Sequence, residues 1–247
     1  MGEPELVRFK GKKGPKRPRY VEHADAFDGA DGTGSVTGLK ALSADAGCVK
    51  VYVDRVQVAR VSALEVDRLG LARGVAWTGE LARRVRQASA LYEAERAGIR
   101  MLAGRARSAA LIERGLRRRG HDAHAIPAAI DRLRDRGFVD DEAYAAGVAR
   151  SELGRKPAGR RLLEARLRRD GVDGAIIGRV LAEAFADRDE RDDAMRLARR
   201  QAPALSRHEP EVAERRLVAR LARRGFDAET ARACARAALL EAGEATP

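Results

Sequence analysis

The 247-residue sequence is poor in aromatic side chains and in long apolar runs. Aromatic residues make up 4% of the chain, although 45% of it is hydrophobic. A core must therefore come mainly from Ala, Leu, Val and Ile, which suits closely packed helices better than a β-sandwich. No stretch approaches the roughly 18 apolar residues that a membrane-spanning helix needs, and the basic start lacks the apolar segment of a secretion signal. We therefore expect a soluble, cytoplasmic protein that has no membrane partner.

Motifs for catalysis and metal binding are also missing. Cys48 and Cys234 are far apart and lack metal-ligand spacing, which favours a reduced pair over a disulfide. The chain has no Gly-x-x-x-x-Gly-Lys-Ser/Thr phosphate loop, and no nucleophile–base pair emerges. His121 and His124 lie three residues apart, but no further ligand completes a metal set. We predict a protein that is not an enzyme and needs no metal and no cofactor.

Positive charge is what the chain has in excess. Its 49 Lys and Arg residues outnumber 37 Asp and Glu residues, which gives a net charge of +12 and a pI near 10.4. Such a charge is typical of proteins that bind nucleic acid or acidic surfaces. Arginines can also reflect genome composition and merely solvate helix faces, but their uneven spread here favours binding.

The first 47 residues show no hydrophobic periodicity. A basic stretch is followed by an acidic, glycine-rich one, so we predict a disordered arm over residues 1–47. The arm is either a tether for nucleic acid or an idle solvated tail, and the sequence leaves both interpretations open.

Residues 48–104 predict a small module of a β-hairpin and helices. Valines alternate between residues 49 and 58 on both sides of Asp54-Arg55, a pattern typical of a hairpin with a two-residue turn. Ser62 is placed to cap a short helix, and Thr78 a long one that runs through Met101. Trp77 could stack a base, although an anchor within the module is the favoured role.

Residues 105–152 predict three short amphipathic helices. Ser108 and Asp140 are placed as caps, and Gly120 and Gly137 end the first two helices. Such helices are too short to be stable alone, so their apolar stripes must pack together, with Tyr144 in that core. Asp140 and Asp141 could suggest a Mg²⁺ site, but acids at a helix start favour capping.

The same pattern returns twice. The string Leu-Arg-Arg-Arg-Gly-His-Asp that ends at Asp122 recurs as Leu-Arg-Arg-Asp-Gly-Val-Asp and as Leu-Ala-Arg-Arg-Gly-Phe-Asp, which place glycines at Gly171 and Gly225. Three occurrences at a nearly constant period favour tandem repeats over an all-helical protein with generic caps. We predict repeats over residues 105–152, 153–202 and 203–240 with a frayed tail at 241–247. The second departs from the first, because an acid-rich stretch replaces its Gly-Phe-Val-Asp-Asp-Glu-x-Tyr turn.

These motifs resemble the bacterial RecX family. The resemblance rests on Arg107-Ser108, on Leu-Arg-Arg-Arg-Gly120, and on Gly137-Phe-Val-Asp-Asp-Glu-x-Tyr144, and it covers roughly residues 48–240. It implies tandem three-helix repeats. We therefore expect a mainly α protein in which the repeats form an elongated, curved array, preceded by the hairpin module and the disordered basic arm.

The resemblance also implies a regulatory function. RecX proteins regulate the recombinase RecA, so we expect binding to RecA as a monomer or filament, and to DNA directly or through the filament. Inhibition of the recombinase, ATPase and co-protease activities would then modulate DNA repair and recombination. The protein itself is expected to be a monomer. Two alternatives stay open: a nucleic-acid-binding protein without a RecA partner, and a scaffold protein that affects neither.

A basic stretch in the second repeat is the predicted binding surface. With its leucines turned inward, the helix that begins near Arg160 must project most of its cations from one exposed surface. The loop before it would leave the first turn of the helix open to an anion. The alternative is a solvated amphipathic helix. The predicted binding residues, including two from the first repeat, are Arg155, Lys156, Arg160, Arg161, Arg168, Arg169, Arg117 and Arg118.

Overall fold

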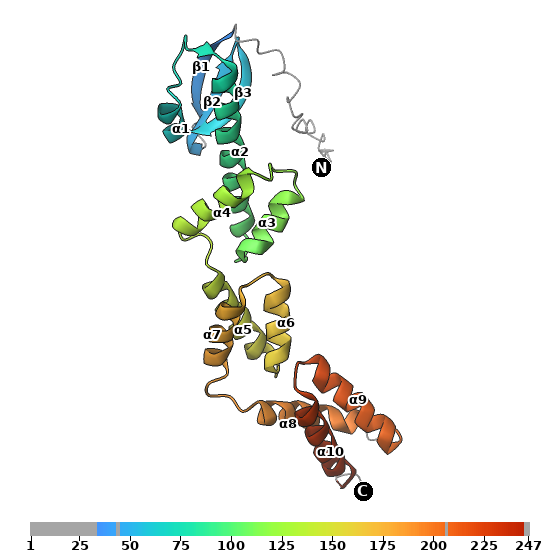
Figure 1. The fold of residues 1–247 in the computed structure, drawn as a ribbon. Coiled ribbons are helices and arrows are strands. Elements are labelled where there is room, and N and C mark those ends of the chain that lie inside the picture. The colour runs from blue at the N-terminus through green and yellow to red at the C-terminus, as the bar shows by residue number, and fades with distance from the viewer. Residues whose placement is uncertain (1–33, 43–44, 206, 245–247) are drawn as a thin grey trace, which may run out of the picture. The chain divides into compact units, whose positions relative to one another are not determined.

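The computed structural model describes residues 34–42, 45–205 and 207–244, and this part of the chain is mainly helical with one small antiparallel sheet (Figure 1). The predicted fold class is thus confirmed. The chain divides into an N-terminal unit, residues 1–86, and a C-terminal unit, residues 87–247. Among the described helices, none is long and apolar enough to cross a membrane.

The N-terminal unit contains a four-stranded sheet within the described residues. Its order is β3-β2-β1-β4, and the register makes every neighbouring pair antiparallel. The predicted hairpin is confirmed, because β2 and β3 turn at Asp54 and Arg55, whose φ angles of 47° and 70° suit a tight hairpin turn. The strands are β1 (Gly34–Leu42), β2 (Asp45–Val53), β3 (Val56–Ser62) and β4 (Ala76–Trp77).

The predicted disordered arm extends too far into the chain. Residues 34–42 form β1 and residues 45–47 begin β2, whereas residues 1–33 lie outside the described part. β1 is held by cross-strand pairing with β2 along nearly its whole length. Its glycines obscure the alternation of apolar residues, and a partner distant in space leaves no local signal.

One face of this sheet forms the core of the N-terminal unit. Val36, Val51 and Val61 are fully buried, and Trp77 is 2% exposed. The ring of Trp77 therefore offers no surface on which a base could stack. The predicted caps are confirmed: Ser62 accepts from Glu65 N at the start of α1 (Ala63–Arg68), and Thr78 accepts from Leu81 N at the start of α2 (Gly79–Leu102).

The helices of the C-terminal unit pack around three separate cores. The first core joins the second half of α2, from Ala94, to the next two helices; we call this the first bundle. The second bundle contains α5, α6 and α7, which lie side by side in Figure 1, and the third contains α8, α9, α10 and the 3-10 turn η2. The elements are α3 (Ala109–Arg117), α4 (Ala125–Asp135), α5 (Asp141–Arg155), α6 (Arg160–Arg169), α7 (Gly174–Ala184), α8 (Glu190–Gln201), η2 (Ala202–Ala204), α9 (Pro210–Arg223) and α10 (Ala228–Glu244).

The bundles are displaced by one helix from the predicted repeats. We assigned α5 to the first repeat, but its Ala145 and Val148 pack in the second core with Leu163 and Leu167. In the same way α8 belongs to the third bundle, which is complete and not short of a helix. The period was correct and its phase was not, because a recurring motif does not say which neighbouring helix shares its core.

The recurring motif itself has the same structure three times. The leucine or isoleucine eight residues before each glycine is fully buried, as is the leucine four before it. Gly120, Gly171 and Gly225 all have positive φ, at 76°, 80° and 86°. Two residues later, an aspartate side chain accepts the N–H two positions further on, at distances of 2.8, 2.8 and 2.9 Å for Asp122, Asp173 and Asp227. The predicted tandem repeat is therefore confirmed for the motif, because its buried residues, glycine and capping aspartate have the same structure in all three copies.

Candidate nucleic-acid interface

The first and second bundles meet where the turn after α6 packs against the start of α3. Ser108 Oγ donates to the carbonyl of Asp170 at 2.5 Å, and it also caps α3 by accepting from Leu111 N. Asp141, from the start of α5, accepts from Ala109 N at 2.8 Å. Gly171 fits closely here, since a side chain at that position would collide with Ala110. We call these contacts the first junction.

The second and third bundles meet through the equivalent parts, which we call the second junction. Gly159 N donates to the carbonyl of Arg224 at 2.8 Å, and Glu190 accepts from Arg160 N at 3.0 Å. The Arg224 side chain donates to the carbonyls of Pro157 and Lys156 and to Glu152. The first turn of α6 was predicted to be open to an anion. That prediction is wrong, because a carboxylate of the next bundle already occupies it.

A basic groove lies between the two junctions. It is a cavity of about 830 Å³ with walls from α3, α5, α6 and the end of α9, and its apolar floor includes Leu111, Val148 and Leu162. Six guanidinium groups and two carboxylates line it. The charged residues of this groove are Arg105, Arg107, Arg166, Arg169, Arg223, Arg224, Glu152 and Asp170.

Two of these arginines hold the groove together. Arg166 and Arg224 both donate to Glu152, at 3.2 and 3.0 Å. By contrast, Arg105, Arg169 and Arg223 form no ion pair within the described residues. Because guanidinium groups bind phosphate and carboxylate through two parallel hydrogen bonds, these three are suited to an external anion.

The arginines at one end of the groove repel one another. Arg107 is half-buried and its Nε donates to the Met101 carbonyl at 2.9 Å. Burial lowers the pKa of Arg107, and the nearby charges of Arg105, Arg119 and Arg118 lower it further. A cluster whose cations disfavour one another is relieved by a bound anion, so this end of the groove is the most favourable place for one.

Tyr144 closes the wall of the groove instead of lying wholly inside a core. Its hydroxyl donates to Asp170 Oδ2 at 2.9 Å, while its ring packs against the second core. Burial raises the pKa of Tyr144 to about 12, and the hydrogen bond to Asp170 adds to the shift. Tyr144 therefore stays neutral at physiological pH and acts as a positioning contact for Asp170.

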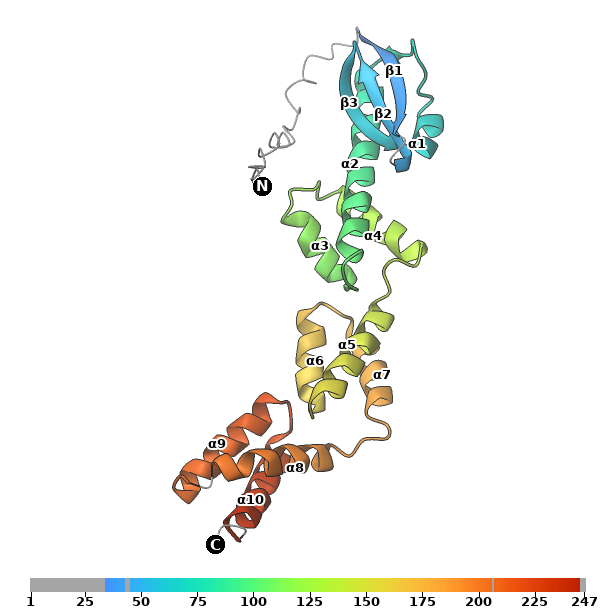
Figure 2. The ribbon, with the colours of Figure 1, turned by 180° about the vertical axis from the view of Figure 1, so that it is seen from behind.

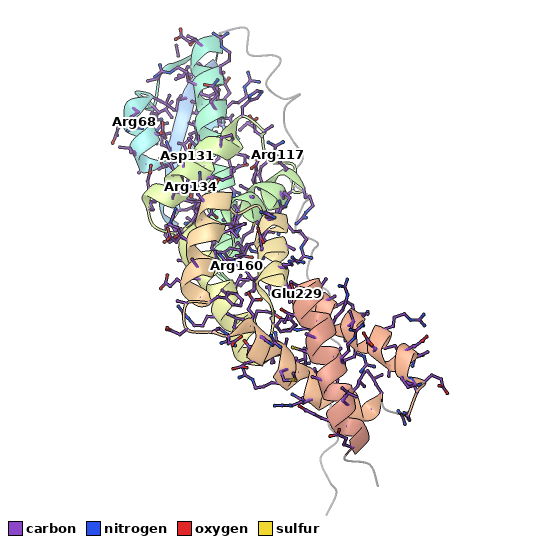
Figure 3. The ribbon with its side chains drawn as sticks, turned by 60° about the horizontal axis from the view of Figure 1, so that its bottom comes forward. Arg68, Arg117, Asp131, Arg134, Arg160 and Glu229 are labelled. Carbon is purple, nitrogen blue, oxygen red and sulfur yellow. The ribbon has the colours of Figure 1, made fainter. Side chains whose placement is uncertain are left out.

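Only one of the predicted binding residues lines the groove. Arg169 does so, and Arg118 contributes to the charge at Arg107. Arg117 projects from the end of α3 and pairs with Glu113 at 2.8 Å, as Arg168 pairs with Glu164 at 2.6 Å (Figure 3). Arg160, labelled in Figure 3 at the start of α6, is half-buried. The others, Arg155, Lys156 and Arg161, are exposed at the end of α5 and the start of α6.

One groove residue that the sequence analysis missed, Arg223, stands at a position that recurs in the repeat. Arg118, Arg169 and Arg223 all stand two residues before the motif glycine. The lysine- and arginine-rich stretch points to α6, whereas this repeated position also marks the turns at Gly171 and Gly225, which pack at the junctions. Arg105 and Arg107 have no such signal, because the loop before α3 has no counterpart in the motif.

The acidic residues at the start of α5 are all engaged in the structure. Asp140 caps α5 by accepting from Glu142 N and Ala143 N, and Asp141 caps α3 across the first junction. Glu142 pairs with Arg179 at 2.9 Å. Within the described residues no group of three His, Cys, Asp or Glu side chains is placed to hold a metal. The capping interpretation is confirmed for Asp140, whereas Asp141 caps α3 and not its own helix.

Comparison with known proteins identifies relatives of this chain. The family model described as the first three-helix domain of RecX matches residues 94–133, bounds that agree with the first bundle. A protein named regulatory protein RecX from Mycobacterium sp. strain KMS is 40% identical over 135 residues, which cover 52% of this chain and 72% of that protein. Its namesake from Chlorobaculum tepidum is 34% identical over 134 residues, covering 54% and 81%.

Two solved structures share the fold. A crystal structure of regulatory protein RecX matches with a TM-score of 0.65 at 18% identity, over 80% of this chain and 96% of that one. The structure of RecX from Lactobacillus salivarius matches with a TM-score of 0.53 at 19% identity, over 62% and 99%. At these identities the structures support the fold alone.

Proposed function

The chain belongs to the RecX family of regulatory proteins, which are not enzymes, and from this we propose that it binds RecA or the RecA–DNA filament and inhibits it. Inhibition would extend to the recombinase, ATPase and co-protease activities, and so would modulate DNA repair and recombination. The protein acts in the cytoplasm as a monomer and without a cofactor.

The basic groove is the observation that carries this proposal. It combines guanidinium groups from all three bundles, so a partner seated there would be held by the array as a whole. A filament presents repeated phosphates and acidic side chains, both of which suit uncommitted arginines. Occupying the filament sterically would stop its growth, and this needs no catalytic residue.

The experiment measures single-strand-DNA-dependent ATP hydrolysis by the cognate RecA while the protein is titrated in below the RecA concentration. Excess single-stranded DNA controls for simple competition. We expect inhibition that survives the added DNA. Inhibition that the DNA erases, together with no binding to DNA-free RecA, would contradict the proposal and favour a nucleic-acid-binding protein without a RecA partner, whose affinity should fall steeply with salt.

Two charge-matched variants locate the surface. The groove variant replaces Arg105, Arg169 and Arg223 by Gln, and the control replaces Arg117, Arg155 and Arg161 by Gln, which removes the same charge outside the groove. We expect the groove variant to need about tenfold more protein for half inhibition, and the control to change this by less than about twofold. The opposite order would move the site to the exposed cations near α6.

A further inference from the structure

The sheet of the N-terminal unit carries three cations in a row across its strands. The register places Lys40 of β1 opposite Lys50 of β2, and Lys50 opposite Arg60 of β3. Residues directly opposite in antiparallel strands project from the same face with Cβ atoms roughly 5 Å apart. Like charges that are directly opposite one another destabilise a sheet, so the Lys40–Lys50 pair has a cost in stability.

An aromatic ring stands beside this row. Tyr52 follows Lys50 by two residues on β2 and therefore projects from the same face. Its cross-strand partner on β1 is Gly38, which has no side chain to cover the ring. Tyr52 is only half-buried. The cations and the ring thus share one surface, which we call the outer face.

A hollow adjoins Tyr52 at the hairpin end of the sheet. It has a volume of about 480 Å³ and is lined by Tyr52 and Gly38 together with two further cations, Arg55 and Arg73. Ser35 and Thr37 also line it, and Thr37 Oγ1 accepts from Arg55 N at 2.8 Å, which fixes the backbone at the turn. Tyr52 therefore has cations on both sides.

The outer face is the side of the sheet that the core does not use. The fully buried residues Val36, Val51 and Val61 project from the opposite face. Figure 2 shows β1, β2 and β3 in front, with the start of α2 behind them and α1 to one side. Among the described residues of this face, Lys40 and Arg60 are exposed and Lys50 is half-buried.

We propose that the outer face binds single-stranded nucleic acid, with the Lys40–Lys50–Arg60 row on the phosphates and Tyr52 stacked on a base. Adjacent strands are about 4.8 Å apart, so the row extends over about 10 Å and can contact more than one phosphate of the same strand. Stacking on an aromatic ring beside a positive surface is how proteins hold single strands without reading their sequence. An acidic protein surface would use the cations but not the ring.

The test measures binding of a fluorescent oligothymidylate to the full chain without RecA, by anisotropy over a series of salt concentrations. Tyr52→Leu should weaken binding about tenfold, and Tyr52→Phe, which keeps the stacking ring, should stay within about twofold of the parent. Lys50→Gln should reduce the slope of log affinity against log salt by about 0.7, the value for one phosphate contact on a single strand.

Arg68→Gln is the control for loss of one charge, because Arg68 is exposed on α1 of the same unit, where it pairs with Glu65 at 3.5 Å. It should leave the salt slope unchanged. Thermal unfolding separates lost binding from lost folding: Lys50→Gln relieves repulsion in the row, so its melting temperature should rise while its affinity falls.

Two results would overturn the proposal. Equal oligothymidylate binding by the parent, Tyr52→Leu and Lys50→Gln would remove nucleic acid from the outer face. Polyglutamate binding that depends on Lys50 but not on Tyr52 would make the outer face a site for acidic protein. Neither result depends on RecA, so each is separate from a failure of the proposed regulation.

Discussion

The two junctions of the C-terminal unit use equivalent backbone positions and different side chains. At the first, the Ser108 hydroxyl donates to the carbonyl before a motif glycine; at the second, the backbone N–H of Gly159 does so. Asp141 and Glu190 hold equivalent places at the starts of α5 and α8, and each accepts an N–H from the start of a helix in the preceding bundle. The backbone geometry of the junction is thus kept while its chemistry changes.

The residue before the motif glycine has opposite charge at the two junctions. At the first junction it is Asp170, which accepts a hydrogen bond from Tyr144. At the second it is Arg224, which donates to two carbonyls and to Glu152. The carboxylate turns a tyrosine toward the groove wall, whereas the arginine fixes the loop before α6. Divergent repeats can therefore stack in the same way.

Within the described residues, the third bundle differs from the first two at the start of its second helix. α9 begins seven residues before its buried Leu217, whereas α6 begins three before Leu163. The additional turn has Pro210 at its first position, where its missing N–H costs no helix hydrogen bond.

The largest predicted effect is a difference in stability between substitutions at Gly171 and Gly225, which pack at the junctions, and at Gly120, which has open space around it. Gly225→Ala places a methyl group against the Leu162 backbone and should lower the free energy of unfolding by about 4 kcal/mol. Gly171→Ala meets only the Ala110 side chain and should cost about 3 kcal/mol, partly restored by adding Ala110→Gly. Gly120→Ala has open space and should cost about 1 kcal/mol from positive φ alone. Urea unfolding measures all three, and equal losses would contradict the comparison.

A second prediction compares Tyr144 and Asp193, which lie four residues after the N-caps of α5 and α8. Tyr144 in α5 has Asp193 as its equivalent in α8, where the carboxylate is 2% exposed and bonded by Arg188 and Arg196. Asp193→Ala should cost about 2 kcal/mol, because the buried ion pairs are lost although both arginines can reach water. Tyr144→Phe, which loses one hydrogen bond, should cost about 1 kcal/mol. If chemical unfolding gives the reverse order, the buried acid is not the stronger contact.

The carboxylate caps give a third prediction. Asp141→Ala and Glu190→Ala each remove a cap from a helix of the neighbouring bundle and should each cost about 1 kcal/mol. Equal costs would support equivalent junctions. Asp141 also pairs with Arg134 at 3.6 Å, so a slightly larger loss there is expected, and the additional Arg134→Gln change should remove the difference.

The smallest predicted effect is a pH dependence confined to the first junction. The folded pKa of Tyr144 is raised from 10.0 to about 12, so its contribution to stability is complete below pH 10 and is lost as the pH rises toward 12. Urea midpoints should therefore fall more between pH 9 and pH 11 for the parent than for Tyr144→Phe. Identical slopes would mean that the hydroxyl is not held by Asp170.

Sequence patterns predicted local features such as turns and helix caps, but they did not predict which strands and helices pack together. The hairpin at Asp54-Arg55 and the caps Ser108 and Asp140 each depend on residues close in the chain, and each is confirmed. β1 was missed because its partner strand supplies its order. The groove was missed apart from Arg169, because it draws one wall from each of several distant helices.

Local sequence patterns are sufficient for the periodic parts of this protein: the helices that end at Gly120, Gly171 and Gly225, the capping aspartates that follow, and the family that these motifs indicate. Each depends on backbone preferences and hydrogen bonds within a few residues. Tertiary packing determines which helices share a core, where the motif turns dock, and which arginines face one another. Those outcomes depend on contacts between different helices, such as Arg160 with Glu190 and Glu152 with Arg224, which are 30 and 72 residues apart, and no local pattern encodes them.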